Sequence, residues 1–239
     1  MALYGKIRDK ITKPFRTAVI VAAGSSTRLG QDKLLLPLGG VPVLARTLRA
    51  FESCAMVDEI IVVTRADRLQ EFAALRDRYC VKKLSQVVVG GATRAGSSLA
   101  GVMAASKKAT VIAIHDGARP LVTPELIEAV IRKAEQRQAA APVLPLKDTV
   151  KERSGDMLVR TPARESLAAV QTPQAFNAEL IRAALIDAQE KKLAITDDCS
   201  AVEAIGLPVA SVDGDEENIK ITTAMDVILA EEIIRRREE

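Results

Sequence analysis

The stretch Thr17–Pro37, TAVIVAAGSSTRLGQDKLLLP, decides the fold of this chain. It opens with Ala18–Ala23, an apolar run that is rich in β-branched residues. A run that is apolar at every position predicts a short strand buried on both faces, as in a parallel sheet that is covered by helices on either side. Gly24 ends this strand and begins a loop.

The loop after the strand combines small residues with two cations. Ser25–Thr27 allows backbone N–H groups to approach an anion, and Arg28 and Lys33 add fixed positive charges. The loop is neither a Walker A motif nor the three-glycine dinucleotide fingerprint. In an arbitrary loop both cations would be solvated charges, but the order of strand, glycine and cation favours a site for phosphates. The loop resembles the signature loop of nucleotidyltransferases that activate sugar or polyol phosphates.

Composition narrows the class of protein. The 239 residues suffice for one large α/β domain, and 48% hydrophobic with 27% charged residues is ordinary for a globular protein. A net charge of +3 gives no reason to expect a nucleic-acid partner, and no apolar run approaches the roughly 18 residues of a transmembrane helix. Residues 1–16 are basic but lack the apolar region of a secretory signal. We interpret them as an N-terminal extension of a single domain, residues 17–239.

Cysteine and histidine are sparse. Cys54, Cys80 and Cys199 are scattered and form no C-x-x-C pair, which argues against a disulfide framework and against a structural zinc site. This pattern indicates a reducing compartment, and we expect the protein in the cytoplasm. His115 is the only histidine, so zinc-hydrolase and His-based triad chemistries lose most of their usual residues.

Strand and helix patterns alternate along the chain. After the first strand, apolar runs predict strands at residues 59–64, 86–89, 109–114, 140–146, 167–170 and 208–212. Helical spacing or composition predicts helices at residues 41–51, 67–79, 124–138, 177–191, 197–205 and 224–236. This order predicts an α/β fold of Rossmann-like, three-layer type, with a mostly parallel sheet between two layers of helices.

A second glycine loop follows the strand at residues 86–89. Gly90–Ser98, GGATRAGSS, again places glycines, an arginine and hydroxyls at the start of a helix. Because the carboxyl ends of parallel strands gather at one edge of the sheet, this loop should face the first loop across a cleft that could hold a base and a ribose. A glycine turn with a serine cap on the next helix explains the pattern equally well.

The strand at residues 109–114 delivers His115–Pro120, HDGARP, to the same edge. Asp116 is a natural Mg²⁺ ligand there, because Mg²⁺ takes one or two carboxylates and completes its shell with substrate phosphates and water. Arg119 would then be available for a second anion. A lone histidine at a strand end more often makes a structural hydrogen bond, so we assign His115 no catalytic role.

Residues 147–165 form a polar segment of a different kind. Ser154–Asp156 lies between two short alternating runs, residues 149–151 and 157–159, which is the pattern of a β-hairpin with little apolar material. We predict a protruding arm that packs on a second subunit, the alternative being an excursion into solvent.

Together these motifs resemble those of the 2-C-methyl-D-erythritol 4-phosphate cytidylyltransferase family. The resemblance runs collinearly from residue 17 to about residue 235. The first loop alone is unspecific, because molybdenum-cofactor nucleotidyltransferases carry a similar one. Residues 196–198 (TDD) also match, and the segments that narrow the resemblance are the HDGARP motif, residues 172–174 (TPQ) and residues 218–222 (NIKIT).

The resemblance implies that CTP and 2-C-methyl-D-erythritol 4-phosphate react to the CDP-alcohol and pyrophosphate, in non-mevalonate isoprenoid biosynthesis. It implies a catalytic set of Arg28, Lys33 and Lys220. It implies CTP contacts by Ala22, Ala23, Gly24, Gly91, Ala92, Ser97 and Asp116, with Asp116 holding Mg²⁺. It implies contacts to the second substrate by Arg119, Thr149, Arg164, Thr172, Thr196 and Lys220. In a homodimer that exchanges its arms, Thr149 and Arg164 would serve the partner's site.

The resemblance also implies a mechanism without a general base, because a phosphate monoester with a second pKa of about 6 is already largely a dianion at neutral pH. The chain departs from the family where Ala92 and Gly96 replace residues that are often acidic, so cytosine contacts there would rely on backbone groups. The nearest alternative is ribitol 5-phosphate cytidylyltransferase, which Ala22–Gly24 and Gly117–Ala118 disfavour. A nucleotide-binding protein without catalysis is a more distant one.

Overall fold

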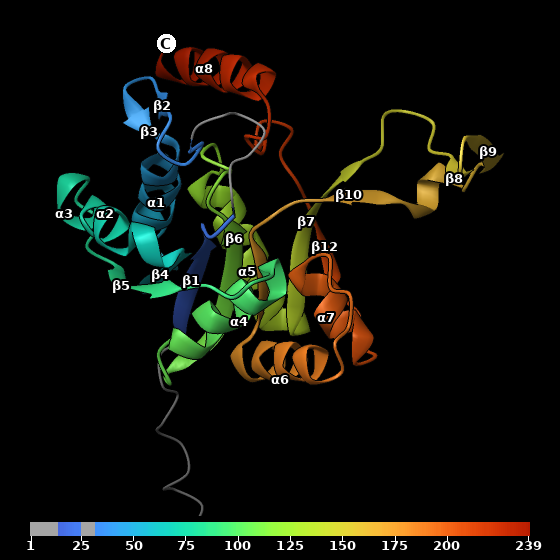
Figure 1. The fold of residues 1–239 in the computed structure, drawn as a ribbon, viewed down its shortest axis with the longest axis horizontal. Helices are drawn as coiled ribbons and strands as arrows, with labels where there is room; N and C mark the ends of the chain where they lie inside the picture. The colour runs from blue at the N-terminus through green and yellow to red at the C-terminus, as the bar shows by residue number, and fades with distance from the viewer. Residues whose placement is uncertain (1–13, 25–31) are drawn as a thin grey trace, which may run out of the picture.

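A sheet of eight strands forms the middle layer of the structure (Figure 1). The computed structural model describes residues 14–24 and 32–239. Among these residues the strands of the sheet are β1 (Phe15–Val21), β4 (Glu59–Thr64), β5 (Leu84–Val89), β6 (Ala109–Asp116), β7 (Ala139–Pro145), β10 (Ala168–Val170), β11 (Gln174–Asn177) and β12 (Ala210–Asp213).

The sheet is mostly parallel, as predicted. Strands β5, β4, β1 and β6 lie side by side in that order and all run parallel. β11 is antiparallel to both β6 and β7, so β7 points the same way as β6, and β12 pairs parallel with β7. Val143 pairs with Val170 of β10 and with Asp213 of β12, which places β10 and β12 on opposite sides of β7.

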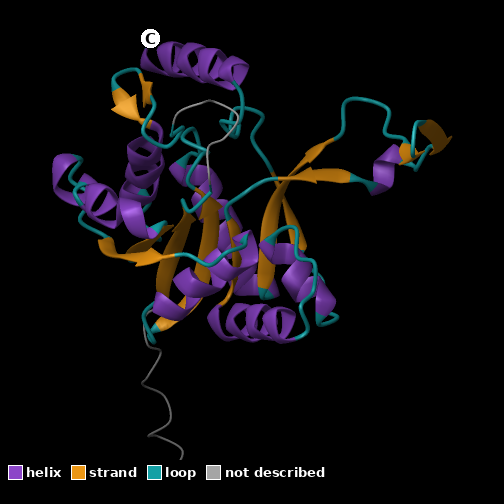
Figure 2. Ribbon diagram, viewed as in Figure 1, coloured by secondary structure: helices purple, strands orange, loops and turns teal. Residues whose placement is uncertain are grey.

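Helices cover both faces of the sheet (Figure 2). One layer contains α1 (Val43–Ser53), α2 (Leu69–Ala73), α3 (Leu75–Arg78) and α5 (Pro124–Arg137). α8 (Ala224–Glu238) shares the hydrophobic core of that layer but lies beyond the edge of the sheet (Figure 1). The other layer contains α4 (Arg94–Ala104), α6 (Ala178–Glu190) and α7 (Asp198–Ala204). Successive strand residues point to opposite faces: Ala18 and Ile20 pack in the first core, and Val19 packs in the second. The three-layer α/β architecture expected from the alternating patterns is confirmed.

The loops after β1, β5 and β6 meet at one edge of the sheet. The backbone N–H of Ala22 bonds to Val63 O at 2.7 Å, and the N–H of Gly117 bonds to Val21 O at 2.9 Å. Gly90 fits only without a side chain, because a Cβ there would lie 2.6 Å from Ser97 Oγ and 2.9 Å from Ala23 Cβ. Close packing of small residues therefore brings the two glycine loops together, as the order of elements predicted.

The first strand begins earlier than predicted. β1 starts at Phe15, so Phe15 and Arg16 belong to the sheet although we assigned them to the N-terminal extension. Arg16 donates from its backbone N–H to Asp58 Oδ2 at 2.9 Å and from Nε to Glu135 Oε1 at 2.8 Å. These long-range partners explain the strand, since a basic residue in an extended stretch gives no apolar signal.

The prediction of a single helix at residues 67–79 is wrong. It consists of a 3₁₀ turn, η2 (Ala66–Arg68), followed by α2 and α3, with Ala74 between them. Phe72 is the buried residue of α2 and Leu75 is that of α3. Because one buried side chain anchors each piece, packing does not require a continuous helix. A further pair of short strands, β2 (Pro37–Leu38) and β3 (Val41–Pro42), precedes α1.

β11 was not predicted, because the sequence Gln174–Asn177 has one large apolar residue. That residue, Phe176, is fully buried, and the strand inserts between β6 and β7. The Thr172–Pro173 peptide just before it is cis.

The arm is a β-hairpin that extends away from the sheet (Figure 1). Its strands are β8 (Glu152–Ser154) and β9 (Met157–Arg160), joined to β10 through η3 (Arg164–Ser166). The first strand of the hairpin was predicted at residues 149–151, which is wrong by three positions, because β8 lies at residues 152–154. Gly155 adopts a φ of +60°, the positive value that the turn requires. Met157, Leu158 and Val159 are 64%, 65% and 59% exposed, so the hairpin leaves most of their apolar surface open to solvent.

No helix formed by residues 14–24 and 32–239 is both long enough and apolar enough to cross a bilayer.

Candidate active site

A cleft of about 400 Å³ opens where the loops after β1, β5 and β6 meet the segment before α8. Its lining includes nine residues proposed from the sequence, namely Ala22, Ala23, Gly24, Lys33, Gly91, Ala92, Ser97, Asp116 and Lys220. It also includes Val21, Leu34, Thr93, Arg94 and Ala118, which we did not propose as site residues. The fold thus gathers into one cavity all seven residues that the resemblance assigned to CTP.

One wall of the cleft is the start of α4. The Thr93 hydroxyl caps this helix by accepting from Gly96 N at 3.0 Å. Ser97 Oγ donates toward the carbonyl groups of Thr93, at 3.0 Å, and Gly91, at 3.3 Å. A Cβ on Gly91 would lie 2.8 Å from the Gly96 carbonyl carbon, so Gly91 must be glycine for the loop to fold back on the helix. The predicted serine cap is wrong, because Thr93 caps this helix. The prediction that this loop lines a cleft together with the first loop is confirmed.

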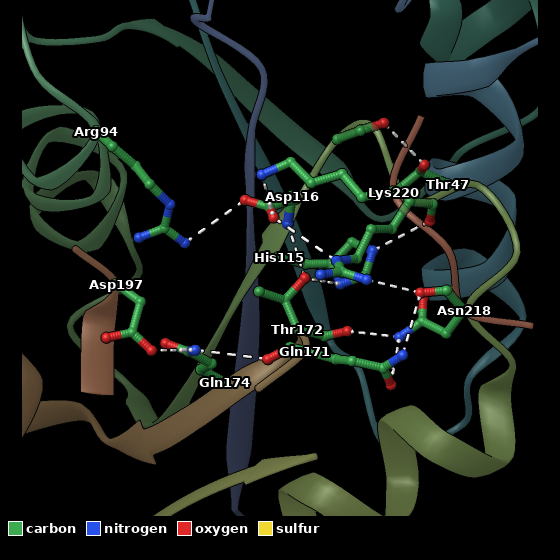
Figure 3. Close-up of polar contacts among 12 residues, drawn as sticks. Thr47, Arg94, His115, Asp116, Gln171, Thr172, Gln174, Asp197, Asn218 and Lys220 are labelled. Carbon is green, nitrogen blue, oxygen red and sulfur yellow. Dashed lines mark hydrogen bonds and ion pairs between the residues drawn. The ribbon is translucent and has the colours of Figure 1, made fainter. Parts of the chain in front are cut away.

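Asp116 lies at the end of β6 and is surrounded by cations (Figure 3). Lys220 Nζ is 2.9 Å from Oδ2, Arg94 Nη2 is 3.5 Å from Oδ1, and Arg119 Nε is 3.7 Å from Oδ2. Burial would raise the pKa of this carboxyl, but Lys220 first, then Arg94 and Arg119, outweigh it and lower the pKa to about 2. Asp116 is therefore ionised at every physiological pH.

Arg94 spans two carboxylates. Besides Asp116, its Nη2 atom contacts Oδ2 of Asp198 at 2.9 Å, and the Asp198 side chain is fully buried. Burial raises the pKa of Asp198, and the guanidinium of Arg94 is the main influence that opposes it. Among the described residues, Arg94 alone forms an ion pair with Asp198, so the cleft wall is tied to the start of α7.

His115 is locked in a structural role. Its Nε2 atom lies 3.2 Å from the Arg119 carbonyl oxygen, which can only accept, so Nε2 carries the proton. The Nδ1 atom then accepts from the Thr172 hydroxyl at 3.0 Å, and that oxygen in turn accepts from Asp116 N at 3.1 Å. Complete burial lowers the pKa of His115 to about 4. The ring is neutral and has both nitrogens engaged, as expected for a structural histidine.

The segment that carries Lys220 is clamped to the sheet edge (Figure 3). Asn218 Nδ2 donates to Thr172 O at 2.9 Å, and Arg119 Nη1 donates to Asn218 O at 2.7 Å. Gln171 Nε2 donates to Asp215 O at 2.8 Å. These bonds, from residues just outside the cleft, fix the backbone from which Lys220 reaches Asp116.

The described residues contain no cluster of three or more His, Cys, Asp or Glu side chains that could hold a metal ion. Of the described residues that line the cleft, Asp116 is the one that carries a carboxylate, and it is ionised. That donor set suits a cation such as Mg²⁺ that is held jointly by one carboxylate and by the phosphates of a ligand, and it does not suit a cage built from protein ligands alone.

Other proposed residues lie outside the cleft lining. Both Arg119 and Thr172 nevertheless contact Asp116. Arg119 Nε lies 3.7 Å from Asp116 Oδ2, and the Thr172 hydroxyl accepts from the backbone N–H of Asp116 at 3.1 Å. Thr149 and Arg164 are exposed residues of the arm region, with Arg164 Nη1 bonded to Lys147 O at 3.0 Å. Thr196 is exposed just before α7. Arg28 lies outside the described residues.

Sequence reasoning did not identify Asp198, Gln171 or Asn218 as residues that organise the site. Asp198 follows a helix cap, Asp197, where an acidic residue is expected on helix-dipole grounds alone. Its full burial beside Arg94 is a tertiary property. The sequence offered one signal that could have identified these residues. Each lies in, or next to, one of the motifs TPQ, TDD and NIKIT that carry the resemblance.

Comparison with known proteins identifies the family. The family model described as IspD, 2-C-methyl-D-erythritol 4-phosphate cytidylyltransferase, matches residues 17–236. The chain is 39% identical over 224 residues to the protein of that name from Halalkalibacterium halodurans, covering 93% of this chain and 98% of the relative. It is 41% identical over 224 residues to that from Caldanaerobacter subterraneus, covering 92% and 99%.

A solved structure agrees with these relatives. The crystal structure of 4-diphosphocytidyl-2C-methyl-D-erythritol synthase from Anaerococcus prevotii superposes with a TM-score of 0.83 and 32% identity, covering 93% of this chain and 99% of that chain. The fold, the cleft at its strand ends and the match over residues 17–236 show that this chain is a nucleotidyltransferase that belongs to the 2-C-methyl-D-erythritol 4-phosphate cytidylyltransferase family.

Proposed function

We propose that this chain joins CTP to 2-C-methyl-D-erythritol 4-phosphate and releases pyrophosphate, a step of non-mevalonate isoprenoid biosynthesis. The observation that carries the proposal is a single ionised carboxylate, Asp116, set among Lys220, Arg94 and Arg119 in a cleft that Lys33 also lines. Such a site suits a triphosphate, because several cations oppose its charge while one carboxylate remains for a metal. The relatives carry the methylerythritol name, which favours that substrate over ribitol 5-phosphate.

The nucleotide would lie along the wall formed by the two glycine loops. Gly91 and Ala92 offer backbone groups to the base, and Ser97 borders the same space. Because Ala92 has no polar side chain, we propose that cytosine is read mainly by backbone N–H and C=O groups. The small residues Ala22–Gly24 leave room for the phosphates at the end of β1.

The reaction would be an in-line displacement at the α-phosphorus of CTP. The phosphate of the second substrate is a dianion at neutral pH and needs no general base. This agrees with His115, whose ring nitrogens are both engaged and whose pKa is lowered to about 4. Lys33 and Lys220, together with Arg28, would stabilise charge that develops on the α-phosphate and on the leaving pyrophosphate.

Asp116 would hold Mg²⁺ together with the triphosphate. When bound, the ion supplies positive charge that neutralises the phosphate oxygens. Residues of this chain prepare Asp116 for that role. Lys220 and Arg94 keep its carboxyl group ionised, and the Thr172 hydroxyl fixes the backbone from which the carboxylate projects.

The second substrate would bind between the cleft and a partner's arm. Arg119, Thr172 and Thr196 would contribute from one subunit, and Thr149 and Arg164 from the arm of the other. The exposed apolar residues 157–159 support a homodimer, because a hairpin that leaves most of its apolar surface exposed gains stability by packing on another surface. Cys54, Cys80 and Cys199 are all free thiols, which supports a reducing, cytoplasmic location.

The test is pyrophosphate release by the purified protein with CTP and Mg²⁺, run in parallel with methylerythritol 4-phosphate and ribitol 5-phosphate. Release with the first substrate alone is the expected result. Release with ribitol 5-phosphate alone would move the chain to the alternative substrate, and no release with either substrate would contradict the proposed reaction.

A further inference from the structure

We infer that Asp198, which lies outside the cleft lining, is a positioning residue that sets how Arg94 divides its charge within the cleft. The inference rests on the proposed function, because it concerns how the cleft receives CTP. Two distances support it: Arg94 Nη2 lies 2.9 Å from Asp198 Oδ2 and 3.5 Å from Asp116 Oδ1. The guanidinium is therefore closer to the buried carboxylate than to the carboxylate in the cleft.

Asp198 can hold Arg94 because its own position is fixed by the start of α7. Gln174 Oε1 accepts from the backbone N–H groups of Asp198 and Cys199, each at 3.0 Å. Gln174 Nε2 donates to Asp197 Oδ2 at 2.8 Å (Figure 3). Asp197 in turn caps the helix in a capping box with Ser200. This rigid frame makes Asp198 an anchor rather than a side chain that follows Arg94.

The anchor matters because Asp116 has to be shared. Lys220 and Arg119 already engage Oδ2 of Asp116, so Oδ1 is the oxygen on which Arg94 would close. Without Asp198, the attraction between Arg94 and Asp116 would no longer be opposed, since Coulomb attraction strengthens as the distance shortens in a partly buried site. A closed Arg94–Asp116 pair would compete with the metal and triphosphate for that oxygen.

Removing the charge of Asp198 should weaken the binding of CTP rather than slow turnover. Asp198→Asn keeps the shape of the side chain and removes its charge, so Arg94 shifts toward Asp116. The affinity for CTP with Mg²⁺ falls about tenfold, the size of an ordinary coupling between residues in contact. The loss appears in the dissociation constant and in KM for CTP, while kcat at saturating CTP changes far less, because bound CTP and metal displace Arg94 again.

A double-mutant cycle separates this role from a purely structural one. Calorimetric titration with CTP and Mg²⁺, without second substrate, is applied to the wild type, Asp198→Asn, Arg94→Gln and the double variant. We expect Asp198→Asn to weaken binding only while Arg94 is present. Equal weakening in the Arg94→Gln background, or unchanged affinity in folded Asp198→Asn, overturns the inference.

Glu203→Gln is the matched control. It removes one negative charge from an exposed residue of the same helix, and among the described residues Arg94 forms no ion pair with Glu203. We expect it to bind CTP like the wild type. A loss equal to that of Asp198→Asn would mean that any charge change on α7 suffices, and would overturn the specific role of Asp198.

A measurement on the wild type covers the case in which Asp198→Asn does not fold. In a crystal structure with CTP and Mg²⁺, Arg94 should remain paired with Asp198 while Asp116 faces the ligand. Arg94 leaving Asp198 in that complex overturns the inference. Failure of the wild type to bind CTP would instead overturn the proposed function, and this inference with it, whereas wild-type binding with an unaffected Asp198→Asn overturns the inference alone.

Discussion

Lys220 Nζ lies 2.9 Å from Asp116 Oδ2, so the segment before α8 closes on the end of β6 across the cleft. Neither position could be fixed by local structure alone. Lys220 is held by the bonds of Asn218 to Thr172 and to Arg119, and Asp116 is held by its backbone N–H bond to Thr172. A network centred on Thr172 therefore sets the distance between a cation and the carboxylate that it keeps ionised.

Replacing Lys33 by alanine should lower turnover far more than it raises KM for CTP. In the proposed mechanism its charge acts on the transition state, and loss of such an interaction costs roughly 10²-fold to 10³-fold in kcat. Steady-state kinetics with CTP and methylerythritol 4-phosphate measures both constants. Lys107→Ala, an exposed lysine in the turn between α4 and β6, is the control and should leave both unchanged. A normal kcat for Lys33→Ala would remove Lys33 from the mechanism.

Asp116 should make the stability of the protein depend on pH at low pH. Its pKa is about 2 in the folded protein, against 3.8 for the free group. A carboxyl with a depressed pKa stabilises the folded state above pH 4, and this contribution is lost as the pH falls toward 2. The difference in unfolding free energy between wild type and Asp116→Asn should therefore shrink by about 2 kcal/mol between pH 5 and pH 2.

Urea unfolding of both proteins at the two pH values measures this difference, because the remaining carboxyl groups titrate in both proteins and cancel. A difference that stays constant with pH would contradict the lowered pKa of Asp116.

His115 should remain neutral through the whole range in which the enzyme is assayed. It is the only histidine in the chain, so its NMR signals need no assignment by mutation. With a pKa lowered to about 4 by burial, the ring should show the Nε2–H tautomer and no titration above about pH 5. A midpoint near pH 6.5 would mean that the ring is accessible to water and available as a base.

The arm should mediate dimerisation through its exposed apolar residues. Leu158→Asp places a charge between the exposed apolar residues Met157 and Val159. Because burying an unpaired charge in an interface is costly, the variant should be a monomer at micromolar concentration. Sedimentation velocity measures the change. Leu207→Ser, which alters an exposed leucine away from the arm, is the control and should leave the dimer intact. A wild-type monomer under these conditions would contradict the proposed homodimer, and a dimeric Leu158→Asp would contradict the role of the arm.

The outline of the fold could be predicted because its signals are local. Runs such as Glu59–Thr64, buried at every position, mark strands that lie inside a sheet. Thr123 marks a helix start because its hydroxyl caps the first turn, whereas at α4 the cap is Thr93 and not the predicted serine. The patterns failed where the strand depends on distant partners. Arg16 is a basic residue just before the apolar run, and Phe176 stands among residues that give no sign of a strand.

By itself the sequence determined the order of the parallel strands β1, β4, β5, β6 and β7, and hence that the two glycine loops and Asp116 gather at one sheet edge. Periodicity of burial and the handedness of parallel connections suffice for that. Only the tertiary structure decided which charges pair. Arg94 takes a buried partner in Asp198, and His115 stays neutral beneath Thr172, because ion pairing and desolvation depend on distances across the fold that sequence spacing does not encode.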